Sequence, residues 1–202
     1  MASMSRILTI PNLLTFMRMA LIPVFAIFLY YGEFGWALAA FLVAGFSDGL
    51  DGLIARAFSQ QSELGMVLDP IADKLLMTTA FILLTFLNNL PKVDNLPIWF
   101  GVTALVIGRD ILILAAAAAI HIVTGFRGFQ PSWPGKISTL VQVATIGLVL
   151  ITAAFPQINS FYLPWAYVVV AFFAFISGLH YIYFISKLLN EETKHAPHSS
   201  AE

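Results

Sequence analysis

Apolar residues occur along the chain in six long runs, separated by short segments rich in glycine, proline, asparagine and charged residues. Each run is close to the length of about 20 residues that a helix needs to cross the hydrocarbon core of a bilayer. Glycine, proline and asparagine favour turns, so each separator marks a change of direction. The pattern therefore predicts an all-α polytopic membrane protein with six transmembrane helices, over residues 13–32, 35–56, 66–88, 97–123, 136–155 and 163–188.

The composition agrees with this pattern. Hydrophobic residues make up 59% of the chain and charged residues 10%, with a mean hydropathy of +0.87, whereas soluble domains carry about 25% charged residues. The run that starts at Leu13 is longer than the apolar core of a signal peptide, and we interpret it as an uncleaved first helix. We predict one membrane domain over residues 1–189 and a flexible tail over residues 190–202, where the apolar pattern is lost.

Lysine and arginine are distributed unevenly between the two ends of the predicted helices, and this bias sets the orientation of a membrane protein. If the N-terminus is cytoplasmic, the opposite side carries only Lys92. The cytoplasmic side then carries Arg6, Arg18, Arg56, Lys74, Arg127, Lys136, Lys187 and Lys194. We therefore predict that both termini are cytoplasmic.

Cysteine content and net charge narrow the chemistry. The chain contains no cysteine, so disulfides are excluded and any metal would be bound by oxygen or imidazole ligands. The net charge of -1 provides no basic field for a nucleic acid. We therefore predict no nucleic-acid partner.

Four aspartates lie toward the predicted cytoplasmic ends of the second and third helices. Asp48 and Asp51 are three residues apart and Asp69 and Asp73 are four apart, so each pair shares one helix face. A short connection makes the two helices antiparallel neighbours, and the four carboxylates can converge on one pocket. The alternative is that they cap helices or face solvent. A charge at the centre of a membrane helix costs about 2.5–3.5 kcal/mol, which favours a functional site.

Four negative charges in one site require cations. Carboxylates without cysteine or a histidine cluster suit Mg²⁺ or Mn²⁺. Two such ions about 4 Å apart can bind both the attacking and the leaving oxygen of a phosphoryl displacement. We predict a centre of two Mg²⁺ or Mn²⁺ ions bound by Asp48, Asp51, Asp69 and Asp73.

Small residues accompany the aspartates. Gly52 and Ala55 share the helix face of the first aspartate, and Gly65 opens the next helix, so a flat group could approach the backbone closely. Gly45 and Gly49 form a small-xxx-small pattern, for which we favour helix packing.

The spacing of these residues resembles the signature of the CDP-alcohol phosphotransferases, a family of membrane enzymes. The match covers eight defined positions, namely Asp48, Asp51, Gly52, Ala55, Arg56, Gly65, Asp69 and Asp73. The resemblance implies transfer of a phosphatidyl or phospho-alcohol group from a CDP-linked donor to an acceptor hydroxyl, with release of CMP. It also implies a homodimer.

The resemblance further implies a role for each matched residue. Asp48 and Asp69 would bridge the two metal ions, and Asp51 would bind one of them. Asp73 would bind the other ion and act as the catalytic base. The CDP-linked donor would lie against Gly52, Ala55, Arg56 and Gly65.

The residues around the third and fourth aspartates indicate a subfamily. Residues 68–74, with residues 10–15 and Arg18 upstream, are similar to the pattern of phosphatidylglycerophosphate synthase. Cardiolipin synthase of the eukaryotic type, which uses phosphatidylglycerol as acceptor, shares much of this pattern. We therefore expect transfer of a phosphatidyl group from CDP-diacylglycerol to glycerol 3-phosphate in phospholipid biosynthesis, with cardiolipin synthase as the alternative.

Three further polar residues are candidates for the acceptor site. Arg109 falls within the fourth predicted helix, where a charge is costly unless it is paired or faces a wet cavity. An ion pair with Asp110 is one interpretation, but adjacent helix residues point about 100° apart, and we favour phosphate binding. Lys136 is either a positive-inside anchor or an acceptor ligand, and both interpretations remain open. Ser132 lies four residues before Lys136 and completes the predicted acceptor site.

A divalent cation transporter is the alternative of a different class, because intramembrane carboxylates also bind cations in transport proteins. A transport path needs polar groups through the membrane depth, whereas these aspartates cluster toward one end of the predicted helices. We therefore favour the enzyme. We expect it in the inner (cytoplasmic) membrane, surrounded by membrane lipid, with its active site facing the cytoplasm.

Overall fold

The computed structural model describes residues 10–58, 63–124 and 133–195, and the regular structure in these ranges is helical. The helices are α1 (Ile10–Tyr30), α2 (Phe34–Phe58), α3 (Glu63–Phe86), α4 (Phe100–Thr124), α5 (Trp133–Ala154) and α6 (Leu163–His195). Side chains are described in these ranges except at residues 10–12, 48–58, 63–67, 69–70, 116–124, 184–185 and 187–195. Each predicted segment corresponds to one helix, so the all-α prediction is confirmed.

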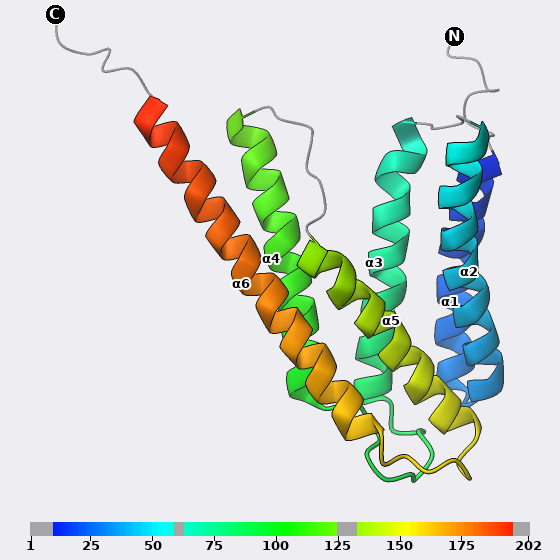
Figure 1. Cartoon of the computed structure of the whole chain (residues 1–202). Helices are drawn as coiled ribbons and strands as arrows, with labels where there is room; N and C mark the ends of the chain where they lie inside the picture. The colour runs from blue at the N-terminus through cyan, green and yellow to red at the C-terminus, as the bar shows by residue number, and fades with distance from the viewer. Residues whose placement is uncertain (1–9, 59–62, 125–132, 196–202) are drawn as a thin grey trace, which may run out of the picture.

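The helices run up and down through the bundle (Figure 1). The connections α1–α2, α3–α4 and α5–α6 lie at one end, which we call the loop end. The second half of α2 and the first half of α3, which carry the four aspartates, lie toward the opposite end, which we call the site end. Helix α5 starts well below the site end, between α3 on one side and α4 and α6 on the other.

The helices form two groups of three. Helix α1 packs against α2 and α3, and α6 packs against α4 and α5. The two groups meet mainly where α2 packs on α5, while α3 makes lighter contacts with α4 and α5. The aspartates therefore belong to one group, and Arg109 and Lys136 belong to the other.

The turn between α1 and α2 follows directly from its sequence. Gly32 has φ 77°, a conformation that strains residues with a Cβ atom. Its N–H donates to the carbonyl of Leu29 at 3.1 Å, and the N–H of Glu33 donates to the carbonyl of Phe28 at 2.8 Å. This pair of bonds is a Schellman motif, which satisfies the last carbonyls of a helix. The predicted turn at residues 31–33 is thus confirmed.

The α3–α4 connection is tied to the helices around it. The Asn89 side-chain amide donates to the carbonyls of Leu29 and Tyr30 at 2.9 and 2.6 Å, and thereby caps α1. The Tyr167 hydroxyl of α6 donates to the carbonyl of Asn95 at 3.0 Å. These bonds stabilise the loop end of both helix groups.

The apolar core lies in the half of the bundle near the loop end. Its fully buried side chains include Phe25, Leu29, Phe81, Leu84, Ile146, Val149, Leu150 and Tyr167. Buried polar residues occur in both halves of the bundle. Those near the loop end are uncharged and include Thr85, Thr103, Thr152 and Ser160. Those farther from the loop end include Thr15, Arg18, Ser47, Arg109, Asp110, Ser138, Gln142 and Ser177. Buried charges are especially costly in an apolar interior, so Arg18, Arg109 and Asp110 in the second set indicate a functional region.

Three of the described helices are long and apolar enough to cross a membrane. They contain the segments Leu13–Tyr30 of α1, Trp133–Ala154 of α5 and Leu163–Tyr183 of α6. Helix α2 contributes a shorter apolar segment, Phe34–Ser47. The chain therefore has the helices of a membrane protein, while the number of six transmembrane spans stays a prediction.

Three details of the sequence interpretation are corrected by the structure. Arg18 is only 1% exposed and Lys74 lies in the middle of α3, so neither is a loop charge that can be counted for orientation. Gly45 is exposed, and a Cβ atom built on it would meet no other atom within 4 Å, so no described part of another helix packs against it. Helix α6 continues to His195, because residues 190–195 include good helix formers, so the start of the predicted tail is helical.

Candidate active site

The four aspartates lie on regular helix, as predicted. Asp48 and Asp51 are on α2, and Asp69 and Asp73 are on α3. At 3.6 residues per turn, the spacing places the two positions of each pair on one face of their helix. Asp73 is near the middle of α3, since this helix begins at Glu63, earlier than the sequence predicted. The carboxylates are therefore spread over the first half of α3 rather than gathered at its tip.

Convergence of the four carboxylates stays a prediction. Asp73 is half-buried, but the side chains of Asp48, Asp51 and Asp69 lie outside the described part of the structure. Among the described side chains, no three histidine or acidic residues form a metal site. The four aspartates nevertheless suit a hard divalent cation as ligands. Each helix carries two aspartates, three or four residues apart, and therefore has two carboxylates on one face.

The predicted donor-binding residues lie near the connection between α2 and α3. Gly52, Ala55 and Arg56 are in the last turns of α2, and Gly65 is in the first turn of α3. Their side-chain environments lie outside the described residues. Their helical placement at the site end, beside the aspartates, agrees with the sequence interpretation (Figure 1).

Arg109 is paired inside the bundle. Its Nη1 donates to Oδ1 of Asp110 at 2.6 Å, and Nζ of Lys74 donates to the same oxygen at 2.9 Å. The side chains of Arg109 and Asp110 are 4% and 8% exposed, and that of Lys74 is 28% exposed. The ion pair between adjacent residues, which the sequence interpretation disfavoured, is therefore present, and it is shared with a third residue from α3.

Other helices complete the surroundings of the guanidinium. Nε and Nη2 of Arg109 both donate to Oγ of Ser177 on α6, at 3.0 and 2.7 Å. Nη2 also donates to the carbonyl of Gly135, at the start of α5, at 3.4 Å. A Cβ atom on Gly178 would lie 3.9 Å from Cγ of Arg109, so a small residue leaves room for the arginine stem. Arg109 thus joins α4, α5 and α6.

The start of α5 brings a further cation to the same region. Lys136 follows Gly135 directly, is exposed, and places its Nζ 5.9 Å from the centre of the Trp133 ring. This distance is within the range of a cation–π interaction. Ser132 lies outside the described residues. The structure thus brings Lys136 and Arg109 to one region, although 26 residues separate Arg109 from Gly135.

The charges of this region favour an anion. Lys74 directly follows Asp73 on α3 and shares the Asp110 carboxylate with Arg109, so Asp110 offsets one positive charge. Lys136 directly follows Gly135, whose carbonyl accepts a hydrogen bond from Arg109. Cationic groups in a partly desolvated site attract anions more strongly than they would in water. Guanidinium and ammonium groups are the usual protein donors to phosphate. The arrangement can therefore hold a phosphate beside a carboxylate.

Three residues of this network were not predicted as site residues: Lys74, Asp110 and Ser177. The sequence carried a signal for two of them, Asp110 and Ser177. Asp110 is an acid inside an otherwise apolar helix, and Ser177 with Gly178 forms a small, polar step in α6. Gln142 on α5 was also not predicted. It is fully buried, and its Nε2 donates to Oγ of Ser138 at 3.2 Å.

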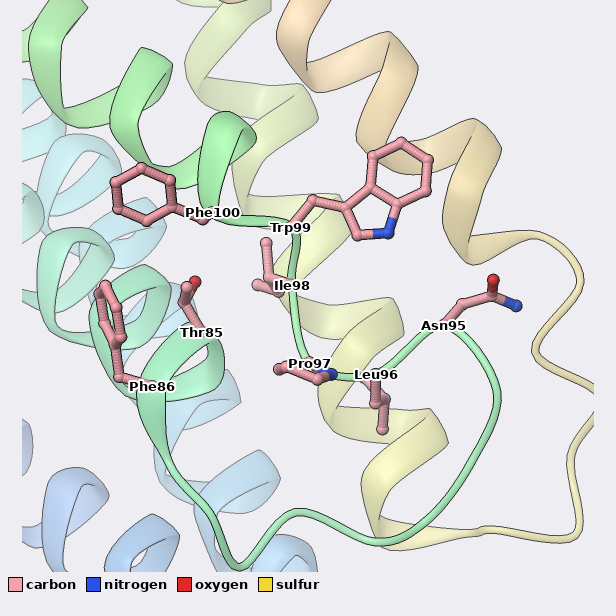
Figure 2. Close-up of a pocket in the computed structure, with 8 residues that line it drawn as sticks. All are labelled: Thr85, Phe86, Asn95, Leu96, Pro97, Ile98, Trp99 and Phe100. Carbon is pink, nitrogen blue, oxygen red and sulfur yellow. The ribbon is translucent and has the colours of Figure 1, made fainter.

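A hollow of about 440 Å³ lies at the loop end, away from these groups. Figure 2 shows that its lining residues come from the end of α3, the connection 87–99 and the start of α4. The lining consists of Thr85, Phe86, Asn95, Leu96, Pro97, Ile98, Trp99 and Phe100. It contains no acidic or basic side chain, so it offers no chemistry for phosphoryl transfer.

Comparison with known proteins identifies the family. Residues 8–178 match the family model for CDP-alcohol phosphatidyltransferase. A probable phosphatidylglycerophosphate synthase of Mycobacterium tuberculosis is 35% identical over 164 residues, which cover 77% of this chain and 72% of the relative. The cardiolipin synthase (CMP-forming) of Rattus norvegicus is 31% identical over 192 residues, or 87% of this chain and 61% of the relative.

A bacterial protein also carries the second name. The cardiolipin synthase (CMP-forming) of Streptomyces coelicolor is 33% identical over 153 residues, which cover 73% of this chain and 67% of the relative. The relatives therefore carry two different names, and the identities do not separate the two subfamilies. The family itself is clear from the extent of the match together with the four aspartates on α2 and α3. The chain belongs to the CDP-alcohol phosphatidyltransferase family, whose enzymes act in phospholipid synthesis.

Proposed function

We propose that the chain is a CDP-diacylglycerol–glycerol-3-phosphate 3-phosphatidyltransferase, which forms phosphatidylglycerophosphate and CMP. The observation that carries this proposal is the junction of α3, α4 and α5, where Lys74, Arg109 and the start of α5 with Lys136 come together. Glycerol 3-phosphate is a small acceptor with a doubly charged phosphate, and it needs cationic donors close to the base. The relative named as a probable phosphatidylglycerophosphate synthase supports the same acceptor.

Two divalent cations, Mg²⁺ or Mn²⁺, are part of the proposal. Asp48 and Asp69 would bridge them, while Asp51 and Asp73 would each bind one. The repeat of carboxylates along α2 and α3 suits oxygen-coordinated cations. When bound, the ions neutralise the negative charge of the donor diphosphate.

Asp73 is the proposed catalytic base. Its carboxylate takes the proton from the acceptor hydroxyl, and the hydroxyl oxygen forms a bond to the phosphorus that carries diacylglycerol. The bond from this phosphorus to the bridging oxygen breaks, and CMP leaves with the electron pair. Arg109, Lys136 and Ser132 hold the acceptor phosphate, so that the primary hydroxyl of the acceptor faces Asp73.

The donor is proposed to lie at the site end of α2 and α3. Its cytidine diphosphate would contact Gly52, Ala55, Arg56 and Gly65, while its acyl chains remain in lipid. A site at the boundary between membrane and cytoplasm suits both parts of such a molecule. The proposal includes six transmembrane helices in the inner (cytoplasmic) membrane, cytoplasmic termini and a homodimer.

Cardiolipin synthase is the second candidate, because relatives with that name are similar to this chain over 73% and 87% of its length. It would use phosphatidylglycerol, a second lipid, as acceptor. Its acceptor carries a phosphodiester with one charge instead of a phosphomonoester with two. The three cations of the junction therefore favour glycerol 3-phosphate.

An acceptor panel tests the proposal. Purified protein in lipid nanodiscs would receive CDP-diacylglycerol, Mg²⁺ or Mn²⁺, and either glycerol 3-phosphate or phosphatidylglycerol, with CMP release and the lipid product measured. We expect turnover with glycerol 3-phosphate. Turnover with phosphatidylglycerol alone would assign the chain to cardiolipin synthesis. Mn²⁺ uptake by proteoliposomes, without CMP release from either acceptor, would instead indicate a transporter.

A further inference from the structure

Asp110 takes no part in the chemistry proposed above, yet its carboxylate joins cations from two helices. One oxygen, Oδ1, accepts hydrogen bonds from Nζ of Lys74 on α3 and from Nη1 of Arg109 on α4. The ammonium and guanidinium groups are therefore held on either side of a single oxygen atom. Without the carboxylate, two like charges at this distance would repel each other.

Burial gives this arrangement its rigidity. Arg109 and Asp110 are both 6% exposed as whole residues, so water does not compete freely for their bonds. Ser177 binds the guanidinium from the opposite side through two hydrogen bonds. A different rotamer of Arg109 would leave a buried charge without these partners, which is strongly unfavourable. The positions of both cations are therefore set by the network.

The bond between Lys74 and Asp110 also links α3 to α4 at a point where these helices pack lightly. A second side-chain bond between them, described at the loop end, joins Thr85 and Thr103 at 2.6 Å. Thr85 lies about three helical turns from Lys74, so the bond of Lys74 is the one nearer to Asp73.

We propose that Asp110 is a positioning residue of the acceptor site. It holds Lys74 and Arg109 as one cationic pair for the phosphate of the acceptor, next to Asp73 on α3. This inference rests on the proposed function. An ion pair that served folding alone would lower stability when broken, without affecting the acceptor more than the donor.

The first test separates the two substrates. In Asp110→Asn the shape is kept and the charge is lost, and we expect the acceptor KM to rise by roughly 10-fold or more, as for other losses of a charged partner. The donor KM should change by less than about 2-fold, because the donor is proposed to lie on α2 and the start of α3. Asp110→Glu keeps the charge, so its acceptor KM should fall between those of the wild type and Asp110→Asn. The matched control is Asp94→Asn, because Asp94 is an exposed carboxylate at the loop end.

The second test asks whether Asp110 acts through Lys74. Lys74→Met removes one of the two cations, so adding Asp110→Asn to this variant should raise the acceptor KM less than it does in the wild type. Equal increases in both backgrounds would overturn the proposal. So would an unchanged acceptor KM in Asp110→Asn, or equal changes toward donor and acceptor. If Asp110→Asn does not fold, the test uses Asp110→Glu instead. An acceptor KM equal to that of the wild type in Asp110→Glu would then overturn the proposal.

The acceptor used in these assays is the one that the wild-type enzyme uses in the panel described above. Failure of the proposed function would therefore appear in the wild type, as turnover with phosphatidylglycerol alone. Failure of the role of Asp110 would appear only in the comparison of variants with the wild type. The two outcomes are thus distinguishable.

Discussion

The guanidinium of Arg109 shows how a cation is accommodated inside an apolar bundle. Each of its three nitrogens donates a hydrogen bond, to Asp110, Ser177 or the carbonyl of Gly135. Removing one partner from a buried ion pair costs about 3–5 kcal/mol, because the other charge is left uncompensated. The angular argument against pairing with Asp110 was wrong because the long arginine side chain can reach across the 100° between neighbouring residues.

The first residue-scale prediction concerns the aspartates. Asp48→Asn, Asp51→Asn and Asp69→Asn should each abolish turnover, because an amide lacks the charge that a divalent cation requires. Asp73→Asn should lower kcat by about 10²–10⁴-fold, the usual effect of losing a general base. CMP release by purified variants is the measurement.

Size-exclusion chromatography in detergent would verify that these variants remain folded, and Asp94→Asn at the loop end would serve as the control with normal activity. Near-normal turnover in any of the first three variants would contradict the two-metal centre. A covalent aspartyl intermediate trapped in the absence of acceptor would contradict direct attack.

At the scale of helices, turns and caps explain where the elements end. Gly32 ends α1 because its φ of 77° is available to glycine at little cost, and Asn89 caps the same helix from the α3–α4 connection. Lys74 and Asp110 link α3 to α4 toward the site end, and Thr85 and Thr103 link them at the loop end. Two polar links therefore connect helices that otherwise pack lightly.

A pair of glycine variants tests this account of the α1–α2 turn. Gly32→Ala should destabilise the protein by about 1–2 kcal/mol, the cost of a left-handed conformation in a residue with a Cβ atom. Gly147→Ala, inside α5 where a Cβ would meet no atom within 4 Å, should be neutral or stabilise by up to about 1 kcal/mol. Thermal unfolding in detergent measures both. An unchanged Tm for Gly32→Ala would show that the turn tolerates another conformation.

At the scale of the whole molecule, the candidate site combines the two groups of helices. Asp73 and Lys74 come from the group α1–α3, whereas Arg109, Lys136 and Ser177 come from the group α4–α6. A phosphate held by the second group would be presented to the base on the first. The apolar core near the loop end holds the groups together, and the buried charged residues Arg18, Arg109 and Asp110 lie farther from that end.

The proposed topology can be tested with single cysteines, because the chain contains none. Ser200→Cys in the C-terminal tail should react with a membrane-impermeant maleimide only from the cytoplasmic side. Asp94→Cys, exposed in the α3–α4 connection, should react only from the opposite side. Labelling of intact spheroplasts and of inverted vesicles gives the comparison. Labelling of both positions from the same side would contradict the six-span topology.

Properties that depend on residues close together in the sequence were determined by the sequence itself. Helix formation in an apolar segment uses backbone bonds within that segment, so the periodic runs predicted all the described helices. The turn at Gly32 depends on the conformational freedom of one residue. The helix faces of the four aspartates follow from spacing alone. Fold class, family and the four aspartates were therefore accessible without coordinates.

Contacts between distant residues were decided only by the tertiary structure. Ser177 lies 68 residues after Arg109, and nothing in the local pattern of either helix specifies that they meet. The burial of Arg18 and the bond from Lys74 to Asp110 depend likewise on how each helix is rotated against its neighbours. Helix rotation is set by side-chain packing and by pairing of buried charges across the bundle. The partners of the acceptor-site cations could therefore be identified only from the packed helices.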